Sequence, residues 1–114
     1  MARFVAIYRE RPDAEAAADF ERAYRQTHLP LVARTPGLIS AEVSAARKTL
    51  AGEPVQFIAE MTFADRESMS AALRTPQWAA AGKNLAEIGG LEIATLVILD
   101  DPEPVDLGAA DTSA

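Results

Sequence analysis

The residues best suited to chemistry are Tyr24 and His28, which lie four positions apart in the stretch 20–38, FERAYRQTHLPLVARTPGL. His28 is the only histidine in the chain. On a helix, Phe20, Tyr24 and His28 lie on one slowly drifting stripe. An imidazole can move a proton near neutral pH, and such general acid–base catalysis is worth about 10²–10⁴-fold in rate. We therefore predict a proton-transfer site in which His28 is the acid or base. Tyr24 would orient it or donate a hydrogen bond to a substrate oxygen.

Both residues also have a structural interpretation. Pro30 frees backbone carbonyl groups in the preceding turn, and His28 could simply bond to these groups. Tyr24 could be a core aromatic residue whose hydroxyl reaches the rim of the core. The residues by themselves leave both interpretations open.

Four further residues are predicted to contact a substrate: Tyr8, Ile58, Glu60 and Thr62. Glu60 interrupts an otherwise apolar strand, and the alternation of a strand places it on one face with the other two residues of its segment. In a closed cavity Glu60 could be a functional carboxylate or the partner of Arg47 or Arg9. It could equally be an exposed or salt-bridged strand residue. Trp78 is predicted to pack against the sheet or a second copy of the chain.

Several classes of site are excluded or unsupported. The chain has no cysteine, so it has no disulfide and no thiolate nucleophile. A single histidine makes a zinc or non-haem iron site held by protein side chains alone improbable. The 114 residues contain no glycine-rich phosphate loop, no G-x-G-x-x-G and no serine elbow. We therefore expect no metal and no cofactor.

The net charge of −6 is concentrated at one end of the chain. Five of the seventeen acidic residues lie in 100–114, which has no lysine or arginine, so residues 1–99 are nearly neutral. We predict one domain over 1–99 and an acidic, disordered tail over 100–114. No basic patch indicates nucleic-acid binding, and no segment has the apolar length of a membrane span or a signal peptide. We expect a cytoplasmic protein.

The pattern of apolar residues predicts four strands and two interrupted helices. The strands are expected at 3–9, 38–48, 55–63 and 91–99, and the helical pieces at 13–27, 30–35, 65–75 and 76–88. Because Leu29 precedes a proline, we expect the first helix to break or turn near His28. The order β-α-β-β-α-β is that of the ferredoxin-like α+β fold, a four-stranded antiparallel sheet with helices on one face.

The uncovered face of that sheet is predicted to be too apolar for full contact with water. We assign to it seven residues from the third and fourth strands: Gln56, Ile58, Glu60, Thr62, Ala94, Leu96 and Ile98. A homodimer that pairs two such faces would bury the apolar part and enclose a partly polar cavity.

Four motifs in order resemble the EthD family. They are F-x3-Y-x3-H-x-P-L from Phe20, P-G-L from Pro36, A-E-M-x-F-x-D from Ala59, and A-L-R-T-P-x-W before G-K. The resemblance covers about residues 3–99. It implies a dimeric α/β-barrel protein, and His28 is the motif residue whose role we carry over. The family is named after a protein required for bacterial degradation of a fuel ether alongside a cytochrome P450 system.

The resemblance also implies a range of functions. Related dimeric barrels include cofactor-free monooxygenases, muconolactone isomerases, polyketide cyclases and haem-degrading enzymes. We therefore expect an enzyme of oxidoreductase, isomerase or lyase type that acts on a small apolar or aromatic oxygenated metabolite, for example in catabolism. The alternative is an accessory protein that binds such a metabolite for a separate redox system without catalysis.

Overall fold

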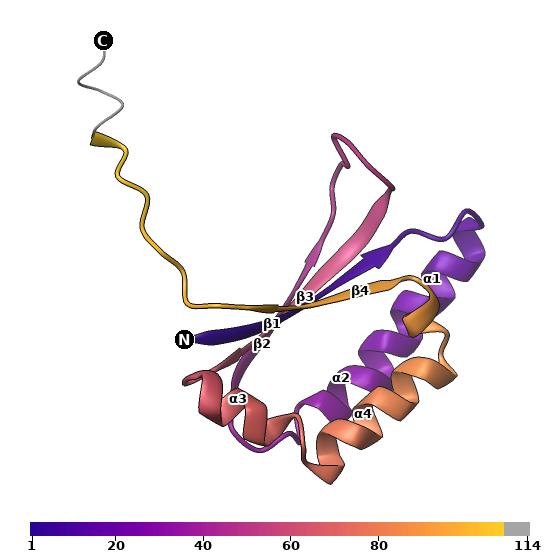
Figure 1. The fold of residues 1–114 in the computed structure, drawn as a ribbon. Helices are drawn as coiled ribbons and strands as arrows, with labels where there is room; N and C mark the ends of the chain where they lie inside the picture. The colour runs from indigo at the N-terminus through magenta and orange to yellow at the C-terminus, as the bar shows by residue number, and fades with distance from the viewer. Residues whose placement is uncertain (109–114) are drawn as a thin grey trace.

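The computed structural model describes residues 1–108, which form a four-stranded antiparallel sheet with the helices on one side (Figure 1). The strand order is β2-β3-β1-β4, and the ferredoxin-like α+β fold is confirmed. In chain order the elements are β1 (Ala2–Arg9), α1 (Ala14–Ala23), the π-helix η1 (Tyr24–His28), α2 (Leu29–Val32), β2 (Leu38–Ala45), β3 (Val55–Phe63), α3 (Arg66–Ala72), α4 (Pro76–Glu87), the 3₁₀-helix η2 (Gly90–Glu92) and β4 (Ala94–Leu99).

Short polar side chains cap the first turns of α1 and α3. The Asp13 carboxylate accepts a hydrogen bond from the backbone of Ala16 at 3.1 Å, at the start of α1. Asp65 does the same for Ser68 at 2.7 Å, at the start of α3. Each cap satisfies a backbone N–H that has no partner within the helix.

The predicted break at His28 is wrong, because the chain stays helical past Pro30. Leu29 has helical angles, φ −58° and ψ −40°, and its N–H donates to the carbonyl of Tyr24, five residues earlier. In an α-helix Pro30 would lack its hydrogen bond and its ring would clash with the carbonyl of Gln26. The wider π turn directly before the proline accommodates it. The preference of a pre-proline residue for extended backbone is therefore overridden at Leu29.

The fourth strand is shorter than predicted. Gly89 has a φ of 82°, and Gly90–Glu92 forms a 3₁₀ turn, so β4 begins at Ala94 and not at Leu91. A Cβ atom on Gly90 would overlap the side chain of Leu85 in α4. This glycine therefore lets the chain leave α4 in close contact with it.

The pairing of β4 with β1 corrects the predicted faces of the sheet. Directly opposed residues of an antiparallel pair point to the same face. The pairs between these strands include Tyr8↔Ala94, Ala6↔Leu96 and Phe4↔Ile98. Because the β1 members lie on the side covered by helices, where Tyr8 and Ala6 are buried, the β4 members do too. The prediction that Ala94, Leu96 and Ile98 lie on the uncovered face is wrong.

Gln56 is also predicted on the uncovered face, but its side chain lies on the side of the helices. The pairing of β1 with β3 shifts by one residue between Tyr8 and Arg9, next to Gln56. Its side-chain amide donates to the backbone carbonyl of Ala17 in α1 at 2.9 Å. The irregular pairing thus allows the Gln56 side chain of β3 to form a hydrogen bond with the backbone of α1.

The uncovered face carries an ion pair between β1 and β3. Glu60 accepts a hydrogen bond from Arg3 Nη1 at 2.9 Å, and neither predicted partner, Arg47 or Arg9, takes this place. Ile58 and Thr62 lie on the same face as Glu60, as the alternation of β3 predicts. Val5, Ile7 and Val97 add apolar side chains on β1 and β4, whereas Glu42 of β2 lies directly opposite Glu60.

The chain leaves the domain after Leu99 (Figure 1). Asp100 pairs with Arg66 at 2.7 Å, and Asp101 pairs with the N-terminal amine at 3.1 Å. Residues 101–107 then form no helix or strand. The remainder of the predicted tail, 109–114, lies outside the described residues. Within residues 1–108, no helix combines the length and the apolarity that crossing a membrane requires.

Candidate functional site

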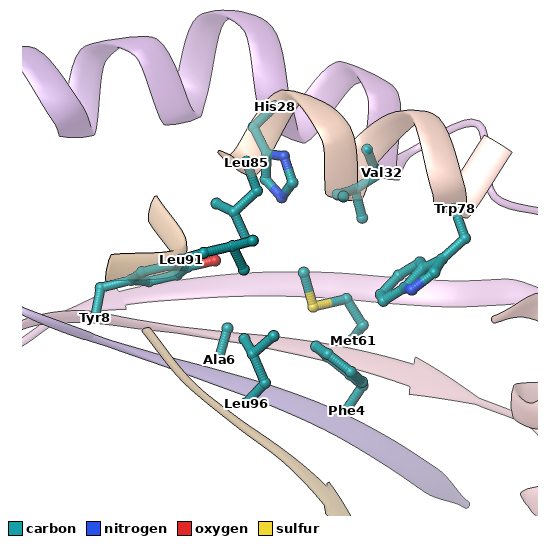
Figure 2. A pocket seen from close by; sticks show the side chains of 12 residues that line it. Phe4, Ala6, Tyr8, His28, Val32, Met61, Trp78, Leu85, Leu91 and Leu96 are labelled. Atoms are coloured by element: carbon teal, nitrogen blue, oxygen red, sulfur yellow. The ribbon is translucent and has the colours of Figure 1, made fainter. Parts of the chain in front are cut away.

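A cavity of about 300 Å³ lies between the helices and the sheet (Figure 2). None of the described residues that line it carries a charge. The sheet and η2 contribute Phe4, Ala6, Tyr8, Met61, Leu96 and Leu91, and the helices contribute His28, Val32, Trp78, Ala81, Gly82 and Leu85. The cavity is therefore an apolar pocket with few polar groups, the usual character of a small-molecule site.

Helix α4 presents a regular stripe to the pocket. Trp78, Ala81, Gly82 and Leu85 follow one another at the helical spacing i, i+3, i+4 and i+7. The Thr75 hydroxyl caps the helix by accepting a hydrogen bond from the backbone of Trp78 at 3.2 Å. The cap thereby sets where the helix, and with it the stripe, begins.

His28 enters the pocket from the helical side (Figure 2). It is the last residue of η1 and only 4% exposed, and its Nδ1 atom has no hydrogen-bond partner among the described residues. Burial lowers the pKa of His28 below its usual 6.5, against the opposing effects of the Ala81 backbone and the Asn84 side chain. The imidazole is therefore neutral at pH 7 and can accept a proton.

The ring of Tyr24 packs against the His28 ring on the side away from the pocket. The two rings lie 4.8 Å apart between centroids, and Tyr24 also contacts the rings of Tyr8 at 5.0 Å and Phe57 at 4.9 Å. Its hydroxyl is buried without a hydrogen-bond partner among the described residues, and Tyr24 does not line the pocket. Burial, followed by the proximity of Tyr8, raises the pKa of Tyr24 far above its usual range.

Tyr8 is the tyrosine that reaches the pocket, and it does so from the sheet (Figure 2). Burial raises the pKa of Tyr8 to about 12, although the neighbouring Tyr24 side chain lowers it. The phenol is therefore protonated throughout the neutral range and can act as a hydrogen-bond donor. His28 and Tyr8 thus face one cavity from its two opposite layers.

The structure brings together only some of the residues predicted to form the site. His28 and Tyr8 share the pocket, while Tyr24 lies one layer behind it. Ile58, Glu60 and Thr62 lie on the opposite face of the sheet, away from the helices and from His28. Two separate features therefore replace the single predicted site: a pocket under the helices and an open sheet face.

Several pocket residues are absent from the predicted site. The predicted alternation of 91–99 places Leu96 on the uncovered face, whereas it lies on the covered one. Leu91 lies in a 3₁₀ turn and not in the predicted strand. Trp78 packs against the sheet as predicted, since its ring meets that of Phe4 edge-on at 5.0 Å. The same ring also lines the pocket. The helical spacing of Trp78, Ala81 and Leu85 is the sequence signal that indicates this wall of the cavity.

The pocket suits a neutral ligand. Its polar side chains are the imidazole of His28, the phenol of Tyr8 and the indole of Trp78, so it offers one proton acceptor and donors for a ligand oxygen. Residues 1–108 contain no group of three or more histidine, aspartate or glutamate residues placed to hold a metal ion.

Comparison with protein families gives one match to the core of the chain. Residues 12–87 match the EthD domain, a segment that includes η1, α2 and α4. No curated protein is significantly similar to the chain.

Solved structures share the fold over nearly the whole chain. An EthD family protein from Bacillus halodurans is 30% identical, with a TM-score of 0.77 over 90% of this chain and 99% of that one. A dimeric ferredoxin-like protein of unknown function from Bacteroides fragilis is 18% identical, with a TM-score of 0.60 over 90% and 95% of the two chains. SnoaB, a cofactor-independent oxygenase from Streptomyces nogalater, is 16% identical, with a TM-score of 0.57 over 92% and 96%.

The buried neutral state of His28 predicts a pH-dependent stability. Below pH 6.5 the unfolded chain binds a proton at this side chain that the folded chain does not, so the stability linked to His28 is present above that pH and lost as the pH falls toward the lowered pKa. In His28→Gln this pH dependence should be absent. Urea unfolding between about pH 5 and 7, above the carboxylate range, measures the difference. Parallel stability curves for the two proteins would mean that His28 titrates normally.

Proposed function

The chain belongs to the EthD domain family, and we propose that it is an enzyme that moves a proton on a small, neutral, aromatic or apolar oxygenated metabolite. The observation that carries the proposal is the pairing of a neutral buried imidazole and a protonated phenol across one apolar pocket. The likeness to SnoaB, a cofactor-independent oxygenase, is consistent with chemistry that needs no cofactor, but it supports the fold alone.

The size of the pocket suggests the size of the ligand. A cavity of about 150 Å³ is enough to hold benzene. The cavity beneath α4 has about 300 Å³, so it suits a compound of about two rings. A charged carboxylate or phosphate would lose its hydration without gaining a cation, because no charged residue among those described lines the pocket.

We assign complementary roles to the two polar groups. An unprotonated nitrogen of His28 takes a proton from carbon next to a carbonyl, and the electron pair of the broken C–H bond moves toward the oxygen. The Tyr8 hydroxyl donates a hydrogen bond to that oxygen and stabilises the negative charge that develops. Return of the proton from the imidazolium to another carbon of the ligand completes an isomerisation. If the proton goes instead to a hydroxyl group on the β-carbon, the C–O bond breaks, water leaves and a C=C bond forms, which is a dehydration. If the enolate carbon first attacks a second carbonyl carbon of the ligand, the proton goes to the new alkoxide and the product is cyclised. Tyr24, behind the pocket, holds His28 in position.

A second candidate is a binding protein that delivers such a metabolite to a separate redox or degradation system. The observation in its favour is the scarcity of polar groups, since an apolar pocket with two hydrogen-bonding side chains is sufficient for binding. The two functions make different predictions for the same variants.

Deuterium exchange tests catalysis without knowledge of the natural substrate. 2-Tetralone is a two-ring ketone with acidic C–H bonds next to its carbonyl, so the protein should accelerate exchange of these hydrogens in D₂O. His28→Gln should slow the catalysed exchange by about 10²-fold or more, and Tyr8→Phe by about 10²-fold. Mass spectrometry or proton NMR measures the exchange, and fluorescence titration measures binding of the ketone.

Tyr24→Phe is the matched control, because it removes a tyrosine hydroxyl that lies behind the pocket and keeps the ring that packs against His28. It should leave the exchange nearly unchanged. A loss equal to that of Tyr8→Phe would make Tyr24 a direct participant instead. If 2-tetralone binds to the wild type and to His28→Gln alike with no catalysed exchange, the delivery function is favoured over catalysis.

We also propose that a second copy of the chain covers the open face of the sheet. Ile58 is 37% exposed there, and Arg3 Nε is buried without a hydrogen-bond partner among the described residues. The similar protein from Bacteroides fragilis is described as dimeric. The apolar side chains of β1 and β4, beside the Arg3–Glu60 pair and the exposed Glu42 of β2, suit a two-fold interface in which the same surface meets itself.

The dimer is tested by placing a charge on that face. Ile58→Asp should convert a wild-type dimer into a monomer, because the interface would bury two unpaired carboxylates. Leu50→Asp, in the hairpin loop where Leu50 is 88% exposed, should leave the dimer intact. Sedimentation at micromolar concentration distinguishes the two states, and a monomeric wild type would refute the interface. Ile58→Asp should still bind 2-tetralone, since Ile58 lies on the opposite face of the sheet from the pocket.

A further inference from the structure

Gly82 occupies an unfavourable place for a glycine. It is the seventh residue of α4, a helix of twelve residues that begins at Pro76, and a further turn of helix follows it. Glycine is among the least favourable residues in a helix interior, since it loses more backbone freedom on folding than any other residue. A glycine at such a position calls for a local reason.

The usual reasons for a glycine are absent at this position. The φ of Gly82 is not positive, unlike that of Gly89 at 82°. A Cβ atom added to Gly82 would meet no atom within 4 Å, whereas one added to Gly90 would overlap Leu85. Neither backbone conformation nor close packing therefore requires the missing side chain at Gly82.

What distinguishes Gly82 is its place at the mouth of the pocket. It lines the cavity and is itself exposed, between Trp78 and Leu85 on the same stripe of α4. Two other lining residues are also exposed, Leu91 at 52% and Leu96 at 44%. These three positions mark the part of the cavity that reaches solvent, and its rim is apolar.

We propose that Gly82 determines the length of ligand that the pocket accepts, by keeping the mouth open for a part of the ligand that extends beyond the cavity. This inference rests on the proposed function of the pocket and narrows its substrate class. The oxygen-bearing rings lie inside, near His28 and Tyr8. An apolar substituent passes Gly82 and contacts the exposed side chains of Leu91 and Leu96.

Two phenols that differ only in length test the proposal. 2-Naphthol fits within the cavity, whereas 6-phenyl-2-naphthol carries an extra ring that must pass through the mouth. Both should bind to the wild type. Gly82→Leu should weaken binding of the longer phenol by about tenfold or more, because even one methylene group in an apolar site can change binding by that factor. Binding of 2-naphthol should change by less than about twofold. Fluorescence titration of the naphthol ring measures both affinities.

Two control variants separate blockage of the mouth from damage to the fold. Ala79→Leu adds the same side chain at an exposed position of α4 that does not line the pocket, and it should change neither affinity. Gly82→Ala should raise the melting temperature by about 2–6 °C, because alanine favours the helix and its Cβ meets no atom.

The outcomes distinguish this inference from the function on which it rests. If the wild type binds 2-naphthol but Gly82→Leu binds the longer phenol as tightly as the wild type does, the role of Gly82 is refuted and the pocket function stands. If the wild type binds 2-naphthol and excludes the longer phenol, the role of Gly82 is refuted in the same way. If the wild type binds neither phenol, the ligand pocket itself is refuted.

Discussion

The hydrogen bond from the N–H of Leu29 to the carbonyl of Tyr24 is the constraint on which the site depends. It closes a π turn directly before Pro30, where an α-helix would lose a hydrogen bond and clash with the proline ring. Because the wider π turn has room for the proline ring, the chain continues from α1 into α2 as one helical segment. Tyr24 and His28 then remain on the same side, with their rings 4.8 Å apart. A break at this point would have separated them.

The position of His28 in turn determines the electrostatic character of the pocket. An imidazolium there would be surrounded by apolar side chains, and no carboxylate among the described residues lines the cavity to pair with it. The imidazole therefore remains neutral, and the same burial keeps the phenols of Tyr8 and Tyr24 protonated. The site carries no net charge at neutral pH, yet it combines a base with a hydrogen-bond donor. A neutral ligand can enter such a site without losing the hydration of a charge.

The sequence predicts the fold better than it predicts the site. Regular alternation in 57–63, the end of α3 before Pro76 and the caps at Asp13 and Asp65 are local signals, and the local structure follows them. The run 91–99 has almost no polar residues, so its pattern cannot say which side chains face the helices. That choice is made by hydrogen bonding to β1, which places Leu96 opposite Ala6. The helical backbone of Leu29 similarly depends on a hydrogen bond to Tyr24, five residues earlier, and the rule for residues before proline takes no account of such a bond.

The alternation of β1 explains why Glu60 and His28 cannot belong to one site. Even-numbered residues of this strand, such as Tyr8, face the pocket, whereas odd-numbered residues, such as Arg3, face the open side. Glu60 pairs with Arg3 and therefore lies on the open side. A slip of one residue in the strand pairing would exchange the two sets, so both surfaces depend on the same register. The sheet itself thus separates the two surfaces.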